Sequence, residues 1–374
     1  MAPRSTRFSK PSSRKSRADP FLDLVSPRCE AKPRFEECLS MAHAQYDVLA
    51  LGNAIVDVIA RTEDDFLLAH NLEKGSMRLI GEPEAETLYK AMGPAHIVSG
   101  GSAANTAVGV ASLGARAAFI GKVKDDEVGH LFTHDIRAAG VGFDSSPALG
   151  GPATARSFIL VTPDGERTMN TFLGACRELG PGDIDPETIE AAEVTYLEGY
   201  LWDPEDAKAA FRKAVSIAHN AGRKVALTLS DSFCVDRYRD EFRALITDGA
   251  IDVLLANEHE LKSLYTTSDF DSAVKALRDE APLAVVTRSA EGSIVIDKEG
   301  VVAVPAQSID RLVDTTGAGD LFAAGFLFGH VRGFSHEEAA RLGAIAAAEI
   351  IQHIGARPET RLKDLAQENG ITIS

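Results

Sequence analysis

The hydrophobic and polar positions follow a repeating order from Met41 to the end of the chain. Short runs rich in Val, Ile, Leu and Ala alternate with longer amphipathic stretches, which is typical of alternating strands and helices. Several runs are apolar throughout, as expected for parallel strands that helices cover on both faces. Strands are expected at Val48–Leu51, Ala117–Ile120, Val194–Leu197, Val225–Leu229, Val253–Leu255, Val285–Thr287, Ser293–Ile296 and Val301–Val304.

Capping residues predict where several helices begin and end. The helix expected at Asn105–Leu113 stops before a glycine, and the helix expected after Asp126 stops at Gly140, as glycine often follows the last turn of a helix. Ser335–Glu338 has the pattern of a capping box. The Ala-rich helix that this box opens is expected to run to Gly355.

Two segments, at about residues 56–82 and 152–174, do not fit the alternation. In the second, the strand-like run Ser157–Thr162 is followed by Pro163–Gly165, a sequence that predicts the turn of a β-hairpin. Both segments are expected to form a small sheet beside the main one. Such a sheet could cover a site at the carboxyl ends of the parallel strands, where open α/β sheets bind ligands.

Charge divides the chain at about residue 40. The formal net charge of the 374 residues is −16, yet the first forty residues carry nine basic and five acidic side chains. This Ser-, Arg- and Pro-rich stretch lacks periodicity, so residues 1–40 are expected to be a disordered basic extension, and 41–374 the folded domain. The extension resembles either an organelle transit peptide or a segment upstream of a wrongly assigned start.

Composition excludes several classes of protein. The acidic balance argues against a nucleic-acid binder, which needs clustered Lys and Arg to neutralise phosphates. No run approaches eighteen consecutive apolar residues, so no membrane span is expected. The four cysteines stand at wide, unmatched spacings that predict neither disulfides nor a CxxC metal pair, which favours a cytoplasmic protein.

The strongest local signal for chemistry is Asp314–Asp320, which precedes the apolar helix expected at Leu321–Phe328. Glycines at a helix start let the backbone approach a ligand, and the free N–H groups there favour an anion. A hydroxyl held at this point could lose its proton to Asp320 while the N–H groups of Gly317–Gly319 stabilise the developing charge. The alternative is a glycine-rich turn with an aspartate favoured by the helix dipole.

Asp314–Asp320 resembles the DTxGAGD signature of the ribokinase/PfkB family of carbohydrate and nucleoside kinases. Gly100–Asn105, together with Ile120–Gly129, resembles the N-terminal signature of the family, and Asn257–Glu260 matches its NxxE motif. The three pieces fall in the family's order, so the resemblance covers nearly all of 41–374. It implies a ribokinase-like three-layer α/β/α sandwich, with a mostly parallel central sheet and a small β-sheet lid formed by the two irregular segments.

The resemblance also implies roles at the phosphate end of the site. Asp320 would be the catalytic base, and the Gly-rich turn would hold the transferring γ-phosphoryl group. Mg²⁺ with ATP would be organised through water by Asn257 and Glu260, for which a polar loop is the alternative. A K⁺ site beside Asp314 and Thr316 is common in relatives and stays open. The residues implied for catalysis are Asp320, Gly317, Ala318, Gly319 and Arg167, and those for ATP are Asn257, Thr287, Arg288, Thr316, Gly317 and Gly319.

The acceptor end of the site rests on Gly52–Asp57, which resembles the GNxxxD start of the family's adenosine kinases. A carboxylate accepts from two adjacent hydroxyls, so Asp57 suits any vicinal diol, sugars included. Arg167 matches a lid arginine that reaches the transferring phosphate, and Tyr200 lies where adenosine kinases place aromatic residues near the base. The alternatives are a turn residue for Asn53, an exposed hairpin residue for Arg167 and core packing for Tyr200. Met77 stands near a lid position where some adenosine kinases carry a polar residue that contacts the base, so the identity of the base stays open. The residues implied for the acceptor are Asn53, Asp57, Gly100, Gly101, Ser102, Asn105 and Tyr200.

The implied reaction is ATP-dependent transfer of the γ-phosphate to the 5′-hydroxyl of adenosine, which gives AMP for purine salvage. A kinase of the same family for ribose, fructose or a related sugar is the first alternative. A catalytically idle member that binds a nucleoside or sugar as a sensor is the second, against which the retained Asp320 argues. The P-loop, dinucleotide, HExxH and GxSxG motifs are missing. A monomer and a homodimer are both compatible, because lids in this family act as flaps or as dimer clasps.

Overall fold

The structure is a computed structural model, and it describes residues 44–373. The prediction that residues 1–40 form a disordered extension lies outside the described residues. Within 44–373, no helix is long and apolar enough to cross a membrane.

The main sheet has nine strands in the order β14-β13-β12-β11-β10-β9-β1-β5-β6. The strands from β12 through β6 run parallel, whereas β13 pairs antiparallel with both of its neighbours. All eight strands expected from the sequence are confirmed, and β6 was missed because two residues carry no periodicity. The bounds are β1 Tyr46–Leu51, β5 Ala117–Ile120, β6 Val141–Gly142, β9 Ala192–Glu198, β10 Lys224–Thr228, β11 Val253–Asn257, β12 Leu283–Thr287, β13 Ser293–Asp297 and β14 Val301–Val304.

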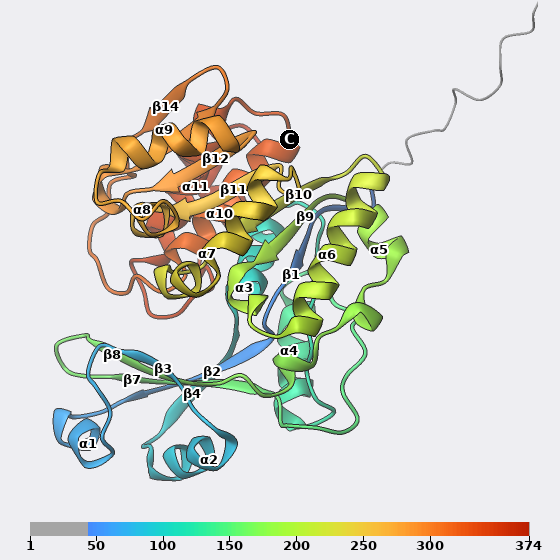
Figure 1. The fold of residues 1–374 in the computed structure, drawn as a ribbon. Coiled ribbons are helices and arrows are strands. Elements are labelled where there is room, and N and C mark those ends of the chain that lie inside the picture. Colours follow the sequence, from blue (N-terminus) through green and yellow to red (C-terminus); the bar gives the residue numbers. More distant parts are fainter. Residues whose placement is uncertain (1–43, 374) are drawn as a thin grey trace, which may run out of the picture. The chain divides into compact units, whose positions relative to one another are not determined.

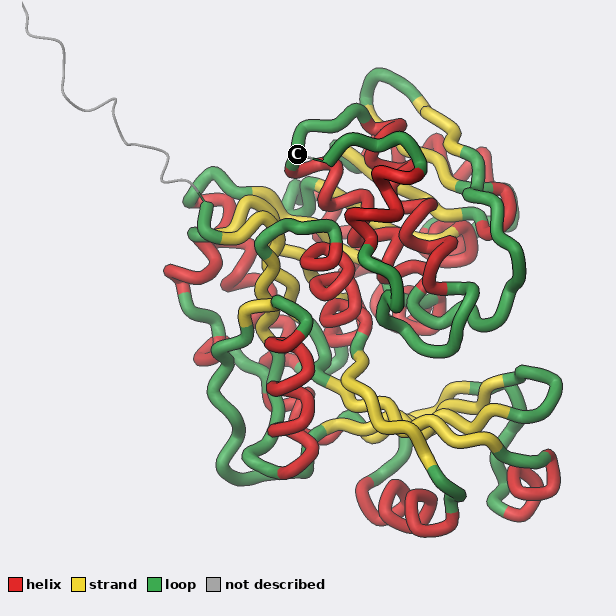
Figure 2. Tube along the Cα trace, turned by 180° about the vertical axis from the view of Figure 1, so that it is seen from behind, coloured by secondary structure: helices red, strands yellow, loops and turns green. Residues whose placement is uncertain are grey.

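Helices cover both faces of this sheet and complete the expected three layers (Figure 1, Figure 2). Two buried clusters, one on each face, form the core. One face carries α3 Ser102–Ser112, α4 Glu127–Ala138, α10 Ala318–Val331, α11 His336–Ile350 and α12 Leu362–Glu368. The other carries α5 Pro186–Glu190, α6 Glu205–Asn220, α7 Ser232–Thr247, α8 Glu258–Leu264 and α9 Phe270–Glu280. Short 3₁₀ turns lie at η1 Gly174–Glu178, η2 Pro181–Asp183, η3 Gly199–Trp202 and η4 Ser289–Glu291.

A second sheet has five strands in the order β3-β8-β7-β2-β4. The expected hairpin is confirmed, since β7 and β8 pair antiparallel and Gly165 takes a positive φ of 84° in the turn. One face of this sheet packs against two helices around a small apolar cluster. The edge strand β4 lies outside the two segments expected to form the sheet. The bounds are β2 Ile55–Arg61, β3 Met77–Leu79, β4 Ala95–Gly100, β7 Ala155–Val161, β8 Arg167–Phe172, α1 Asp64–Ala69 and α2 Glu82–Ala91.

The capping box before α11 is confirmed, but the helix ends at Ile350 rather than at Gly355. The carbonyl group of Ile351 accepts hydrogen bonds from the N–H groups of Val313 (2.8 Å) and Asp314 (3.2 Å), so a distant loop replaces the next helical turn. The chain after α11 therefore turns toward the Gly-rich segment before α10. This contact is tertiary, and no pattern within α11 predicts it.

Candidate active site

A cavity of about 520 Å³ opens at the carboxyl ends of strands β1, β9, β10, β11 and β12. This is the edge at which open parallel sheets bind ligands, because the strands leave their end residues free to face a common space. The start of α10, the start of α7 and the second sheet complete the wall. Thirteen of the predicted residues line it: Asn53, Asp57, Gly101, Ser102, Asn105, Tyr200, Asn257, Glu260, Thr287, Thr316, Gly317, Gly319 and Asp320.

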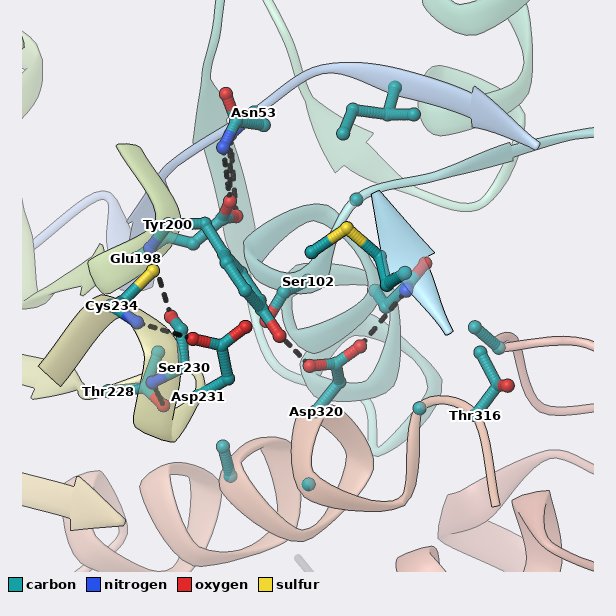
Figure 3. Close-up of a pocket in the computed structure, with 18 of the residues that line it drawn as sticks. Asn53, Ser102, Glu198, Tyr200, Thr228, Ser230, Asp231, Cys234, Thr316 and Asp320 are labelled. Carbon is teal, nitrogen blue, oxygen red and sulfur yellow. Dashed lines mark hydrogen bonds between the residues drawn. The ribbon is translucent and has the colours of Figure 1, made fainter. Parts of the chain in front are cut away.

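Asp320 lies in the first turn of α10, and its carboxylate is held from both sides by α3. Ser102 Oγ donates to Oδ1 at 2.6 Å, and Asn105 Nδ2 donates to Oδ2 at 3.0 Å (Figure 3). Burial raises the pKa of Asp320, and these two hydrogen bonds oppose the rise. Two residues predicted to bind the acceptor therefore orient the predicted base.

The Gly-rich turn before α10 needs glycine at position 317. Gly317 has a left-handed φ of 79°, and a Cβ there would stand 2.9 Å from the Cα atom of Ala356. The N–H groups of Gly317 and Gly319 donate to no other described residue, whereas Ala318 N–H donates to the Thr315 carbonyl at 3.2 Å. Gly317 and Gly319 line the cavity, so two free N–H groups at the helix start are available to a ligand there. Ala318 does not line the cavity.

Glu198, at the end of β9, is a central site residue that the sequence analysis did not single out. It is only 1% exposed, and its carboxylate accepts from Asn53 Nδ2 at 2.7 Å, from Asn53 N at 3.3 Å and from Ala103 N at 2.8 Å. Burial raises the pKa of Glu198 to about 7, against the effect of these donors. In the sequence, Glu198 is marked only as a charged residue directly after the apolar run that predicts the strand. Glu198 ties the loop after β1 to the start of α3.

Replacing Glu198 by alanine is expected to lower the free energy of unfolding by about 3 kcal/mol, because the buried N–H donors of Asn53 and Ala103 lose their acceptor. Urea denaturation measures this difference. Glu193→Ala is the control, since Glu193 lies on the same strand but is half-exposed and pairs with Arg223 at its surface. The control is expected to change stability by about 0.5 kcal/mol or less. Equal losses in the two variants would contradict a central role of Glu198.

Asp57 points from β2 toward the glycines before α3. A Cβ on Gly100 would stand 2.3 Å from its Oδ2 atom, so Gly100 leaves room for the carboxylate without lining the cavity. Asp57 makes no hydrogen bond or ion pair with any described residue, and it faces the cavity. Gly101 has a φ of 94° and turns the chain into α3. The Asp57 carboxylate is free to accept from a ligand.

The acceptor end of the cavity also has apolar walls. Tyr200 extends into it toward Asp320 (Figure 3), and Phe233, near the start of α7, is 58% exposed beside it. Burial raises the pKa of Tyr200, so this hydroxyl stays neutral. Phe233 carries no signal in the sequence, because a single exposed aromatic residue in the first turn of α7 forms no periodic pattern. The second sheet adds Ile55, Met77, Leu79, Ile159 and Met169, and Leu173 follows directly after its strand β8.

Arg167, the first residue of β8, reaches the Gly-rich turn without lining the cavity. Its guanidinium forms an ion pair with the buried Asp314 and donates to Thr316 Oγ1 at 2.8 Å. Asp314 also accepts from the N–H groups of Thr316 and Gly355, both at 3.0 Å. Because the Asp314 carboxylate is already occupied by protein donors, the K⁺ prediction rests on the resemblance alone.

Asn257 and Glu260 hold each other at the start of α8 as a capping box. Asn257 N donates to Glu260 Oε2 at 2.9 Å, and Glu260 N donates to Asn257 Oδ1 at 2.9 Å. Both residues line the cavity, as does Thr287 at the end of β12. Arg288 turns away, pairing with Glu258 at 3.1 Å and stacking on Phe270. The described structure therefore does not bring Arg288 to the predicted ATP site.

These layers around one cavity are the architecture of the ribokinase-like kinases. Residues 47–361 match the model of the pfkB family carbohydrate kinases, and the chain belongs to this family. It is accordingly a phosphotransferase that acts on a hydroxyl group, as the resemblance of its motifs implied.

Solved structures and known sequences similar to this chain include both nucleoside and sugar kinases. The adenosine kinase of Sinorhizobium meliloti is 55% identical, with a TM-score of 0.83 over 87% of this chain and 100% of that chain. A probable sugar kinase of Rhizobium etli CFN 42 is 50% identical, with a TM-score of 0.83 over 87% and 99%. The ATP-dependent ribose-1-phosphate kinase of Halopiger xanaduensis is 34% identical over 61% of this chain and 72% of that protein.

Proposed function

We propose that this protein transfers the γ-phosphate of ATP to the 5′-hydroxyl of adenosine. The observation that carries the proposal is the mixed character of the acceptor end. Asn53 and Asp57 offer polar groups to a ribose, whereas Tyr200, Phe233 and the apolar face of the second sheet offer surfaces suited to a flat base. The similarity to the Sinorhizobium adenosine kinase supports the same substrate.

Asp320 acts as the general base in this proposal. Its carboxylate faces the cavity and is fixed by Ser102 and Asn105, so it can take the proton of a hydroxyl that binds beside it. The hydroxyl oxygen then attacks the γ-phosphorus, and the bond between that phosphorus and the β,γ-bridging oxygen breaks. ADP leaves with that oxygen, and the proton stays on Asp320 until the products depart.

The turn before α10 stabilises the negative charge of the transferring phosphoryl group. Gly317 and Gly319 supply free N–H groups, and Arg167 holds a positive charge against Thr316 at the same turn. Most of the catalysis is then positioning and electrostatic stabilisation, as in phosphoryl transfer generally. Arg167 lies on β8, so the second sheet contributes a positive charge to the site in addition to forming part of its wall.

The NxxE pair fits Mg²⁺ through water rather than by direct coordination. Each carboxylate oxygen of Glu260 already accepts from Asn257, and both residues face the cavity with remaining lone pairs. Mg²⁺ keeps several of its waters, so an outer position suits this donor set. When bound with ATP, the ion neutralises part of the phosphate charge.

A sugar kinase is the second candidate, and Asp57 is the observation that favours it. A free carboxylate accepts from any vicinal diol, and the Rhizobium relative is described as a probable sugar kinase. A free sugar, however, would leave the apolar walls of the acceptor end in contact with polar groups or water.

The two candidates are separated by initial rates of the full chain with Mg²⁺-ATP on adenosine, inosine, guanosine, ribose and fructose. Adenosine is expected to have a kcat/KM at least about 100-fold above that of either free sugar, because only the nucleoside buries a base against Tyr200 and Phe233. Turnover on a sugar alone would reject the nucleoside assignment while leaving the roles of Asp320 and the Gly-rich turn intact.

A further inference from the structure

Phe233 lies at the cavity in a short helical piece. Tyr238, with φ −124° and ψ 23°, breaks the helical geometry of α7 after its first residues, Ser232–Arg237. Ser230, just before this piece, has a positive φ of 72°, which costs free energy in a residue other than glycine. A helix as short as Ser232–Arg237 is not stable by itself. Its position at the cavity therefore depends on contacts with other parts of the chain.

Two contacts join this helical piece to η3, the turn that carries Tyr200. On one side of Phe233, the N–H group of Tyr200 donates to Ser230 Oγ at 3.1 Å. On the other side, Arg237 Nη1 lies 2.9 Å from Oδ1 of Asp203, the residue that directly follows η3. Phe233 therefore lies between two points at which its own segment is fixed to the segment of Tyr200.

Arg237 also packs on the ring of Phe233. Its guanidinium carbon lies 4.5 Å from the centre of the Phe233 ring, a cation–π contact, and 5.2 Å from the centre of the Tyr238 ring. Asp203 pairs with this guanidinium and accepts a hydrogen bond from the Tyr238 hydroxyl as well. Phe233 lines the cavity and is 58% exposed, so Arg237 leaves apolar ring surface free for a ligand.

Asp203 and Arg237 both line the cavity, but their opposite charges are paired with each other. We propose that Arg237 is a positioning residue that, through its ion pair with Asp203, holds Phe233 as a wall for the base of the acceptor. The pair then helps to determine the preference for a nucleoside over a free sugar, which has no base to place against Phe233. This inference rests on the proposed function in one respect, that the acceptor carries a base.

The first test follows the helical piece directly and needs no substrate. Hydrogen–deuterium exchange of the full chain is measured for the peptide with the N–H groups of Cys234 and Val235, which donate to the Asp231 side chain and carbonyl (Figure 3). Arg237→Met and Asp203→Asn are each expected to speed this exchange about fivefold, because the piece opens more often once it is released from η3. Unchanged exchange in both variants would overturn the proposal, whatever the substrate.

Arg243→Met is the matched control. Arg243 lies on α7 after the break in helical geometry, pairs with Glu280 and packs 5.2 Å from the centre of the Tyr265 ring, outside the cavity. The exchange of the same peptide should stay within about twofold of wild type in this control. Arg237→Lys, which keeps the charge without the forked geometry, should lie between wild type and Arg237→Met.

The second test is steady-state kinetics. Arg237→Met is expected to raise the KM for adenosine about tenfold, as loss of one aromatic contact would, while kcat and the KM for Mg²⁺-ATP stay within about twofold. The kcat/KM of any free sugar that is turned over should not change. The double variant Asp203→Asn/Arg237→Met should have the KM of the more impaired single variant, because both changes break the same ion pair. Additive effects would overturn the ion pair as the cause.

The two tests together separate this role from the proposed function. A raised KM with unchanged exchange would mean that Arg237 contacts the base itself, which overturns the positioning role. Faster exchange in a chain that does not phosphorylate adenosine would reject the nucleoside assignment, while the role of Arg237 in holding Phe233 would stand.

Discussion

Replacement of Asp320 by asparagine is expected to lower kcat about 1,000-fold while changing the KM values for adenosine and Mg²⁺-ATP less than about threefold. Asparagine has nearly the shape of aspartate, and its oxygen can accept from Asn105 Nδ2 while its NH2 group donates to the Ser102 hydroxyl, so the cavity keeps its form. It cannot take up the proton of the attacking hydroxyl at neutral pH. Steady-state kinetics over a range of both substrates measures the effect on each constant.

The matched control for this change is Asp269→Asn. Asp269 caps α9 by accepting from Ser272 N at 3.1 Å, lies outside the cavity, and asparagine caps helices equally well. The control should retain wild-type kcat. If Asp320→Asn kept most of its turnover, another group would have to be the base.

The pH profile of the wild-type enzyme gives a further check on Asp320. A base must be ionised to act, and burial raises the pKa of Asp320 above that of an ordinary aspartate. We therefore expect kcat to fall as the pH drops, beginning at a higher pH than a solvent-exposed aspartate would give. The acidic limb should be absent from the residual activity of Asp320→Asn.

Replacement of Arg167 by methionine is expected to lower kcat about 100-fold, because the transferring group loses a fixed positive charge beside the Gly-rich turn. The buried Asp314 loses its cation as well, so a lower melting temperature should accompany the loss. Arg167→Lys, which keeps a charge without the forked geometry, is expected to recover part of kcat. Initial rates at saturating substrates and thermal melting measure the two effects separately.

Arg156→Met is the control for Arg167. Arg156 also lies in the second sheet and its side chain is 11% exposed, against 13% for Arg167, but it pairs with Glu86 away from the cavity. Methionine at this position should leave kcat near wild type. If Arg167→Met lowered only the melting temperature, its ion pair with Asp314 would be structural alone.

Strand positions and the main chemical motif could be predicted because their signals are local. A buried parallel strand needs a continuous apolar run, as at Val48–Leu51, whatever lies beside it. The turn before α10 needs Gly317 for its positive φ, and Asp320 follows it within one helical turn. The same signals led to the ribokinase-like fold, which the match to the pfkB family confirms.

Other features depend on residues far apart in the chain. Glu198 joins Asn53 to Ala103 across 145 and 95 positions, so no window of sequence shows that its carboxylate is occupied. α11 stops early where the N–H groups of Val313 and Asp314 donate to the carbonyl of Ile351, and Ala356 in the segment that follows lines the cavity.

The sequence by itself determined the alternation of strands and helices, the Gly-rich helix start and the carboxylate beside it, since each follows from short-range sterics and burial. Only the tertiary structure decided which donors hold Asp320 and that Arg167 meets Thr316. Hydrogen bonds and charges act through space over a few ångströms, whatever the separation along the chain, so these pairings exist only once the sheets and helices have packed.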